Sequence, residues 1–126
     1  MNVPTTRTDI RQAARDNEAF RREIATGRYE QVVLMAIPPG EAIGEEVHPD
    51  TDQMLIFVEG QGEARIDGEA SAVVADDLVF VHAGMRHDFV NTGDVTLRLI
   101  SVYSPPEHEA GTVHQTKAEA DAAEDH

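Results

Sequence analysis

Four side chains in two separated stretches of the sequence have the types and the spacing of ligands to a metal ion. Glu46 and His48 lie two positions apart, and side chains at that spacing point to the same face of an extended chain. Gln53 opens the apolar run that follows, and His87 comes directly after the tight turn at 82–86. Metal ligands need lone pairs that converge within about 2 to 2.5 Å of one point. The chemistry therefore requires three strand ends that meet in one pocket.

The predicted donor set consists of two imidazole nitrogens, one carboxylate oxygen and one amide oxygen. Such a mixed set suits Mn, Fe, Ni, Co or Zn in an open octahedral or five-coordinate geometry. We therefore expect one divalent transition metal ion as the cofactor, and the donor types do not choose among these five metals.

Each of the four residues also has an interpretation without metal. Glu46 could be a solvated loop acid, and His48 and His87 could be buried residues that form hydrogen bonds only. Gln53 could cap a turn or hydrogen-bond within the pocket. On this alternative, the stretch 40–60 is an acidic turn before a strand.

Short runs of β-forming residues, separated by Gly, Pro, Asp and Asn, follow one another between residues 29 and 104. We expect strands at "QVVLMAI", "QMLIFVE", "GEARID", "ASAVV", "DLVFV", "HDFVN" and "TLRLISVY". So many short strands at close spacing predict an all-β sandwich or small barrel.

The segments on either side of this block have a different character. Residues 1–28 are expected to form an N-terminal helical segment, with one helix over 8–26 or two short helices broken near Asn17, Thr8 as the N-cap and Gly27 at the end. Residues 29–104 are expected to form the barrel domain. In 105–126 paired prolines end the last strand and an acidic, alanine-rich end follows, so a partly disordered tail is expected.

The composition excludes several other kinds of site and partner. The 126 residues contain no cysteine, which excludes disulfides, thiolate metal sites and cysteine nucleophiles. With a formal net charge of -14 the chain lacks clusters of Lys and Arg, so nucleic acid and membranes are not expected partners. The beginning of the sequence has no apolar signal-peptide core, and no run reaches membrane-spanning length. We expect a soluble, cytoplasmic protein of one domain.

The predicted strand at 53–59 is apolar on both faces. Gln53, Leu55 and Phe57 share one face, while Met54, Ile56 and Val58 share the other. In so small a domain the outer face needs a second sheet or a second subunit to cover it. A homodimer is therefore expected.

Two motifs give the sequence a resemblance to a known superfamily. The first stretch resembles the first cupin motif, with Glu46 in place of its first histidine and Gln53 in place of its glutamate: Gly40-x5-Glu46-x-His48-x4-Gln53-x6-Gly60. The second resembles the second cupin motif, with Asp76 and His82 in place of a glycine and a proline: Asp76-x5-His82-x-Gly84-x2-His87-x3-Asn91.

The resemblance implies a cupin fold, that is, a double-stranded β-helix or jelly-roll barrel, with the metal held by the four residues named above. The two substitutions keep the ligand charge of the usual cupin site, because three histidines and one glutamate also carry one carboxylate. The phrases "TGRYEQVVLMAIPPGEAIGEEVH" and "YSPPEHEAGTVHQTKAEADAAE" are similar to small single-domain cupins labelled mannose-6-phosphate-isomerase-like. That label concerns the fold and carries little weight for the substrate.

Two classes of function remain open on this sequence. In one, the protein is a metalloenzyme whose ion acts as a Lewis acid on a small oxygenated organic molecule, with isomerase, lyase or dioxygenase chemistry as in the cupins that it resembles. In the other, it is a noncatalytic module that binds or senses a small ligand. Inward-facing apolar residues favour a modest-sized, partly hydrophobic ligand over a sugar phosphate: Leu34, Leu55, Phe57, Phe89 and Leu99.

Overall fold

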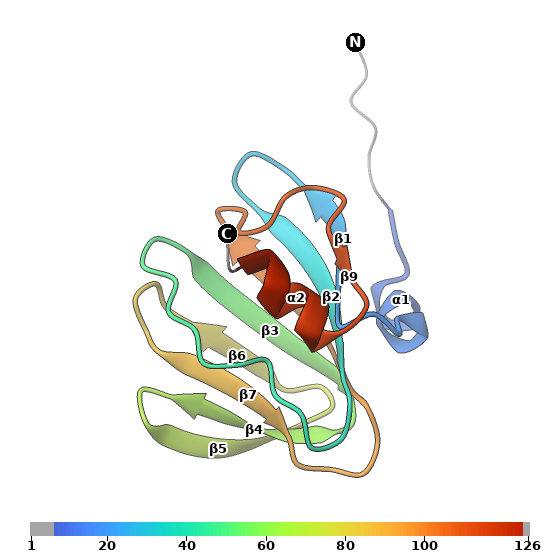
Figure 1. Cartoon of the computed structure of the whole chain (residues 1–126), viewed down its shortest axis with the longest axis vertical. Coiled ribbons are helices and arrows are strands. Elements are labelled where there is room, and N and C mark those ends of the chain that lie inside the picture. Colours follow the sequence, from blue (N-terminus) through green and yellow to red (C-terminus); the bar gives the residue numbers. More distant parts are fainter. Residues whose placement is uncertain (1–6, 125–126) are drawn as a thin grey trace.

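Nine strands form two antiparallel sheets that face each other in the computed structural model, which describes residues 7–124 of the chain (Figure 1). The elements are α1 (Ile10–Asp16), β1 (Arg21–Thr26), β2 (Gln31–Ile37), β3 (Asp52–Glu59), β4 (Gln61–Ile66), β5 (Glu69–Val74), β6 (Leu78–Val81), β7 (His87–Asn91), β8 (Leu97–Ser104), β9 (Val113–His114) and α2 (Lys117–Glu124). The larger sheet has the order β6-β3-β8-β2-β1-β9, and the smaller sheet has the order β5-β4-β7.

The seven predicted strands between residues 29 and 104 all form, as β2 to β8, so the prediction of an all-β fold with a short N-terminal helix is confirmed. The alternation along β3 is also as expected, because Gln53, Leu55 and Phe57 are buried while Met54 and Ile56 are only partly so. Regular alternation works here because each strand has one face toward the facing sheet.

The main hydrophobic core lies between the two sheets. Leu55 and Phe57 enter it from the larger sheet, and Phe89 enters it from the smaller sheet with its ring centroid 5.9 Å from that of Phe57. Burying each such side chain stabilises the fold by about 1.5 to 3 kcal/mol. The core fills the barrel beneath the end at which β3 and β7 begin, and that end carries the polar residues described below.

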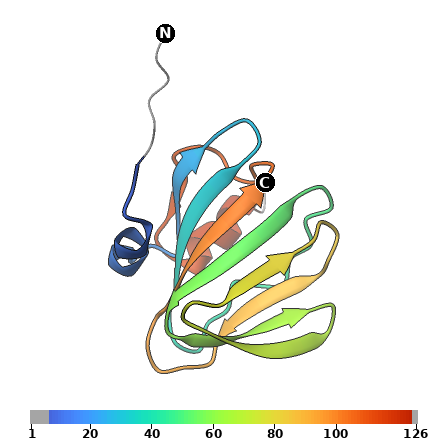
Figure 2. The ribbon, with the colours of Figure 1, turned by 180° about the vertical axis from the view of Figure 1, so that it is seen from behind.

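Leu34 does not face this core, so its prediction as an inward residue is wrong. Together with Ala14 of α1, Val58 and Ile100 it forms a second cluster, on the outer face of the larger sheet. Its neighbours Val33 and Met35 belong to the main core instead. Figure 2 shows α1 lying against this outer side.

The N-terminal helix is shorter than expected. It ends at Asp16, and its N-cap is Asp9, whose Oδ1 accepts a hydrogen bond from the Gln12 amide at 3.2 Å, rather than Thr8. The expected break near Asn17 is present, but the chain then forms strand β1 antiparallel to β2. A strand forms here instead of a helix because it pairs with residues 31–35 of β2, and tertiary pairing overrides a weak helical preference.

The segment after β8 also departs from the expectation of a partly disordered tail. β9 pairs with β1, and the final helix α2 places Ala120 in the main core at 2% exposure. A capping box begins this helix, since Thr116 Oγ1 accepts from the Glu119 amide and Glu119 Oε2 accepts from the Thr116 amide. Within the predicted tail, only residues 125 and 126 lie outside the described residues.

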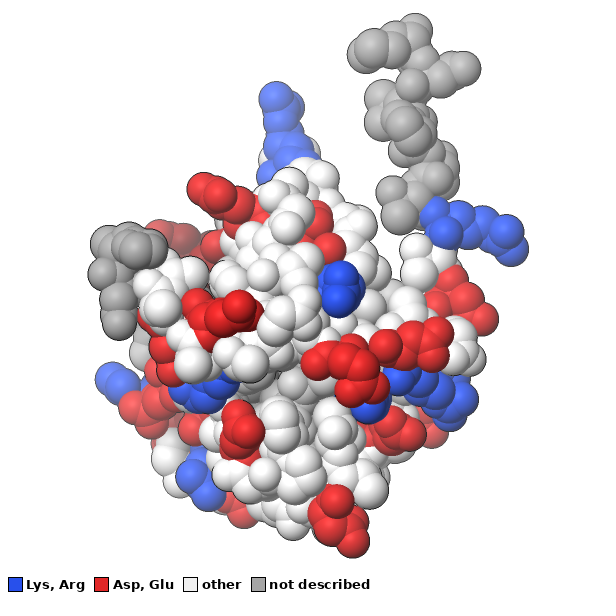
Figure 3. All heavy atoms as spheres, turned by 45° about the vertical axis from the view of Figure 1, so that its right-hand side comes forward, with Lys and Arg blue, Asp and Glu red and all other residues white. Residues whose placement is uncertain are grey.

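On the face seen in Figure 3, acidic side chains are scattered, with Lys and Arg residues between them. Within residues 7–124, no helix is long and apolar enough to cross a membrane.

Candidate metal centre

Glu46 and His87 are brought together by the backbone. Glu46 lies in the connection between β2 and β3, and its amide donates to the His87 carbonyl while the His87 amide donates to the Glu46 carbonyl, both at 2.9 Å. The connection therefore runs as one more antiparallel partner beside the first residue of β7. His48 follows two positions after Glu46, on the same side.

These three side chains converge on one point. One ligand atom from each of Glu46, His48 and His87 lies within 4.8 Å of the other two. The centroids of the two imidazole rings are 5.2 Å apart, and the Nε2 atom of His48 lies 4.0 Å from Oε1 of Glu46. That last separation is too long for a hydrogen bond and leaves room for an ion between the groups.

Hydrogen bonds at Nδ1 orient both imidazoles. The Nδ1 atom of His87 lies 3.0 Å from the Met85 carbonyl oxygen, and that of His48 lies 2.9 Å from a Glu107 carboxylate oxygen. Both partners can only accept, so each neutral ring carries its hydrogen on Nδ1 and keeps a lone pair on Nε2. Both Nε2 atoms are buried without a hydrogen-bond partner among the described residues. Second ring nitrogens held in this way are typical of histidines that bind metal through Nε2.

The turn at 82–86 connects the two histidines. The amide of Gly84 donates to the His48 carbonyl at 2.9 Å, and the next residue, Met85, supplies the carbonyl that holds His87. Gly84 has φ +88°, in the left-handed region that residues with a side chain rarely adopt. The bend that the sequence predicted at this glycine therefore sets the position of both rings.

Gln53 lies at the beginning of β3 and is 3% exposed. Its Nε2 atom donates to Ser101 Oγ at 2.9 Å, while its Oε1 atom is buried with no hydrogen-bond partner in the described part of the chain. In the sheet it pairs with Tyr103, whose ring centroid is 6.1 Å from that of His48. An unsatisfied buried amide oxygen fits the role of a further oxygen donor.

The structure thus brings together Glu46, His48 and His87, while Gln53 lies at the beginning of β3, in the other sheet from His87, with its oxygen unsatisfied among the described residues. Two buried imidazole nitrogens, a carboxylate and an amide oxygen fit a divalent transition metal better than Ca²⁺ or Mg²⁺, which prefer oxygen ligands alone.

Known proteins confirm the family that the two motifs indicated. The sequence profile of the cupin domain matches residues 33–103. The chain belongs to the cupin family. A crystal structure of the protein BH2720 from Bacillus halodurans superimposes on this cupin with a TM-score of 0.93 and 40% identity, covering 94% of this chain and 95% of that one.

Relatives of this cupin include the uncharacterized protein YrkC of Bacillus subtilis, 42% identical over 93% of this chain and 66% of YrkC. The tetracenomycin polyketide synthase protein TcmJ of Streptomyces glaucescens is 37% identical over 61% of this chain and 53% of TcmJ. The chain thus spans between about half and two thirds of the length of these curated relatives.

Three other polar residues within the two motifs have partners outside the metal group. Asp52 accepts from the Ala83 amide at 2.9 Å, and Arg86 points outward to pair with Glu45 at 2.9 Å. His82 is exposed, with its ring centroid 4.9 Å from that of Phe80.

Three aromatic or polar residues around the site were not identified from the sequence. Tyr103 is 1% exposed, and burial raises its pKa to about 12, so its phenol stays neutral. His108 lies with its ring centroid 5.1 Å from that of Tyr103, and burial lowers its pKa to about 3. Glu107 holds His48. The positions of Glu107 and His108 depend on how the segment after β8 folds back, and no spacing rule predicts such a return.

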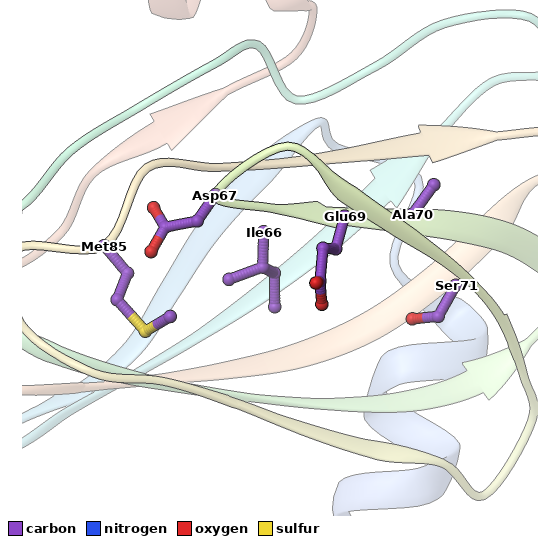
Figure 4. A pocket seen from close by; sticks show the side chains of 6 residues that line it. All are labelled: Ile66, Asp67, Glu69, Ala70, Ser71 and Met85. Carbon is purple, nitrogen blue, oxygen red and sulfur yellow. The ribbon is translucent and has the colours of Figure 1, made fainter.

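A cavity of about 460 Å³ lies at the end of the β4–β5 hairpin, and none of the four predicted ligands lines it (Figure 4). Ile66 and Met85 line it, and the first of these pairs directly with His87 across the sheet. The other lining residues are Asp67, Glu69, Ala70 and Ser71. None of these six carries a positive charge, and two are acidic.

Proposed function

We propose that this cupin is a metal-dependent enzyme that acts on a small oxygenated organic molecule. The observation that carries the proposal is the pair of buried Nε2 atoms on His48 and His87, both unsatisfied in the described chain and both close to the Glu46 carboxylate. Lone pairs left unsatisfied in a buried site cost roughly 1 to 3 kcal/mol each, and a metal ion compensates for that loss.

The predicted ligands are Glu46, His48, His87 and, from β3 of the other sheet, Gln53. A divalent ion bound there would supply a Lewis acid that polarises an oxygen atom of the substrate. The protein's own contribution is to present the two Nε2 lone pairs in fixed orientations and to keep the ring of Tyr103 neutral beside them. The apolar core beneath the site excludes water from one side.

The cavity at the β4–β5 hairpin, whose lining residues Ile66 and Met85 contact His87 through the backbone pairing and the Met85 carbonyl, favours a substrate without a phosphate or a multiple negative charge. Asp67 and Glu69 would repel such a group, whereas Ile66 and Met85 offer apolar contacts. We therefore infer a neutral, partly hydrophobic substrate of modest size. The relative TcmJ is a tetracenomycin polyketide synthase protein, and this name agrees with a partly hydrophobic, oxygenated molecule.

Metal content is the first test. Tag-free protein is analysed for metal as purified, then stripped and reconstituted separately with Mn, Fe, Ni, Co and Zn. One ion per chain is expected for wild type, and loss of stoichiometric metal is expected for His48→Ala and for His87→Ala, with circular dichroism unchanged. His82→Ala is the matched control, since it removes an exposed histidine from the turn next to His87.

Full metal in both histidine variants, or none in wild type with any of the five ions, would contradict the proposal.

Catalysis is tested next by incubating metal-loaded wild type and His87→Ala with a panel of diketones, hydroxyketones and polyphenols, and by following product formation by NMR and oxygen consumption. We expect wild type to turn over a member of the panel and His87→Ala not to do so. Tight binding of a panel member without turnover would favour the noncatalytic binding module instead.

We also propose that the molecule is a homodimer. Leu78 and Phe80 on β6 are 54% and 45% exposed, and they lie beside the partly buried Met54 and Ile56 on the outer face of the larger sheet. A second copy would cover this apolar face.

A further inference from the structure

Glu107, from the segment after β8, contacts the metal site. Its Oε1 atom lies 2.9 Å from Nδ1 of His48, and the two side chains are 26% and 12% exposed, so water screens the contact only in part. The other histidine of the site, His87, is held at the same ring atom by the backbone carbonyl of Met85. Of the two rings, only His48 is therefore oriented by a side chain.

The backbone of Glu107 is itself held in place by a buried glutamine. Gln31, which is 0% exposed at the beginning of β2, accepts with its Oε1 atom from the amides of Glu107 at 3.1 Å and His108 at 3.0 Å. Its Nε2 atom donates to the His108 carbonyl at 2.7 Å. A buried amide that makes several such bonds to one dipeptide fixes that dipeptide, because breaking any of them would leave a buried polar group unsatisfied.

The rest of the segment is tied to the barrel as well. The amide of Gly111 donates to Glu23 of β1 at 2.9 Å, and β9 pairs with β1 through Val113 and His114. Glu107 therefore belongs to a stretch that is anchored both before and after it.

We propose that Glu107 is a positioning residue for the metal site. By accepting the hydrogen on Nδ1 of His48, its carboxylate keeps the Nε2 lone pair of that ring directed toward Glu46 and His87. A carboxylate bonded to the far nitrogen of a ligating histidine fixes the tautomer and raises the basicity of the ring. This inference rests on the proposed metal binding, and it makes the segment after the barrel strands a part of the site.

The test is the affinity of the apoprotein for Co²⁺, titrated into wild type, Glu107→Ala, Glu107→Gln and the control Glu109→Ala. Glu109 carries the same charge two positions away in the same segment and is exposed. Glu107→Ala is expected to raise the Kd about 10- to 100-fold. Glu107→Gln should lose less affinity for Co²⁺ than Glu107→Ala, since an amide oxygen still accepts the hydrogen bond. Glu109→Ala should stay within about twofold of wild type, as expected for a screened surface charge.

A second measurement tests the role of Glu107 in the absence of metal. Histidine ¹⁵N NMR of the apoproteins at pH 8 reports which ring nitrogen carries the hydrogen, with His48→Ala supplying the assignment. Wild type is expected to hold His48 with hydrogen on Nδ1, and Glu107→Ala is expected to shift it toward Nε2 while leaving His87 unchanged. A merely structural role of Glu107 would leave the tautomer of His48 as it is.

Equal Co²⁺ affinity and an unchanged His48 tautomer in Glu107→Ala would overturn the inference while leaving the metal site intact. Equal weakening by Glu109→Ala would also overturn it, because the effect would then be one of overall charge. Failure of wild type to bind Co²⁺ or any of the other four metals would instead reject the proposed function, and the role of Glu107 with it.

Discussion

The two histidines of the site are oriented by hydrogen bonds to different kinds of group, one to the backbone and one to a side chain. A backbone carbonyl in the tight turn holds His87, so its orientation follows from local chain geometry. A side chain 59 positions away in the sequence holds His48, as the residue numbers 48 and 107 show. The first arrangement survives most substitutions, whereas the second can be removed by changing one residue.

The role of Gln53 can be tested by giving its side chain a charge. Gln53→Glu is expected to keep metal binding and to lower the Kd by up to about tenfold, because a charged oxygen replaces a neutral one next to the ion. The same change should lower the melting temperature of the apoprotein, since it adds a buried carboxylate near Glu46. Calorimetric titration with Mn²⁺ and thermal melting measure the two effects.

Gln61→Glu is the control for this substitution, because it makes the same charge change at an exposed position of β4. Loss of binding in Gln53→Glu, with Gln61→Glu unaffected, would show that Gln53 serves the pocket only through its hydrogen bond to Ser101.

Among the elements, α2 has a larger role than its composition suggests. It contributes one small side chain, Ala120, to the main core, and its first turn is fixed by the capping box. Removing residues 117–126 is therefore expected to lower the melting temperature by roughly 5 °C or more, as for other losses of core packing in a domain of this size. An unchanged melting temperature would show that α2 adds nothing to stability.

A pair of substitutions tests the same contact without shortening the chain. Ala120→Asp places a charge in the core and should destabilise the protein strongly, whereas Ala122→Asp lies on the exposed side of α2 and should have little effect. Similar melting curves for both variants would argue against the docking of this helix.

His108, in the segment before α2, is expected to make the stability of the protein depend on pH. Burial lowers the pKa of His108 to about 3, and Arg21, His48 and His114 act in the same direction. Between pH 6.5 and about 3 the unfolded chain binds a proton at this position that the folded chain does not. The stability that the neutral ring contributes is therefore present above pH 6.5 and is lost as the pH falls toward 3.

Melting temperatures measured from pH 7.5 to 4.5 check this linkage. His108→Phe keeps a ring against Tyr103 but cannot bind a proton, so its melting temperature should fall less steeply than that of wild type, with a difference of a few degrees at the acid end. His82→Phe, at an exposed histidine, should follow the wild-type curve. Parallel curves for wild type and His108→Phe would contradict the prediction.

For the whole molecule, the expectation is a dimer built through the outer face of the larger sheet. Light scattering of wild type at micromolar concentration should give twice the chain mass of 13.8 kDa. Replacing Leu78 and Phe80 together by Glu should give the monomer, because both side chains are exposed and apolar on this face. Val95→Glu, at a residue 53% exposed in the β7–β8 connection, should remain dimeric.

A 13.8 kDa species for wild type would contradict the dimer. A dimer that persists in the double variant would place the contact on a different surface.

Much of this protein follows from patterns that are local in the sequence. The period of two along β3, the turn residues between strands and the glycine at position 84 predict β2 to β8 and the bend before His87, because each depends on neighbours only. The same local spacing predicts that Glu46 and His48 share a face. These signals were sufficient for the all-β fold and for placing Glu46 and His48 on one face. The expectation that His87 joins them came from the resemblance to the two cupin motifs, because Glu46 and His87 meet through a backbone pair between distant segments.

Contacts between distant segments decided the rest. Arg21–Thr26 is a strand because β2 offers an edge to pair with, and Leu34 faces outward because α1 covers that side of the sheet. Glu107 meets His48 because Gln31 holds the returning chain. Each of these outcomes depends on the free energy of pairing or burial between residues far apart in the sequence, which no local pattern contains.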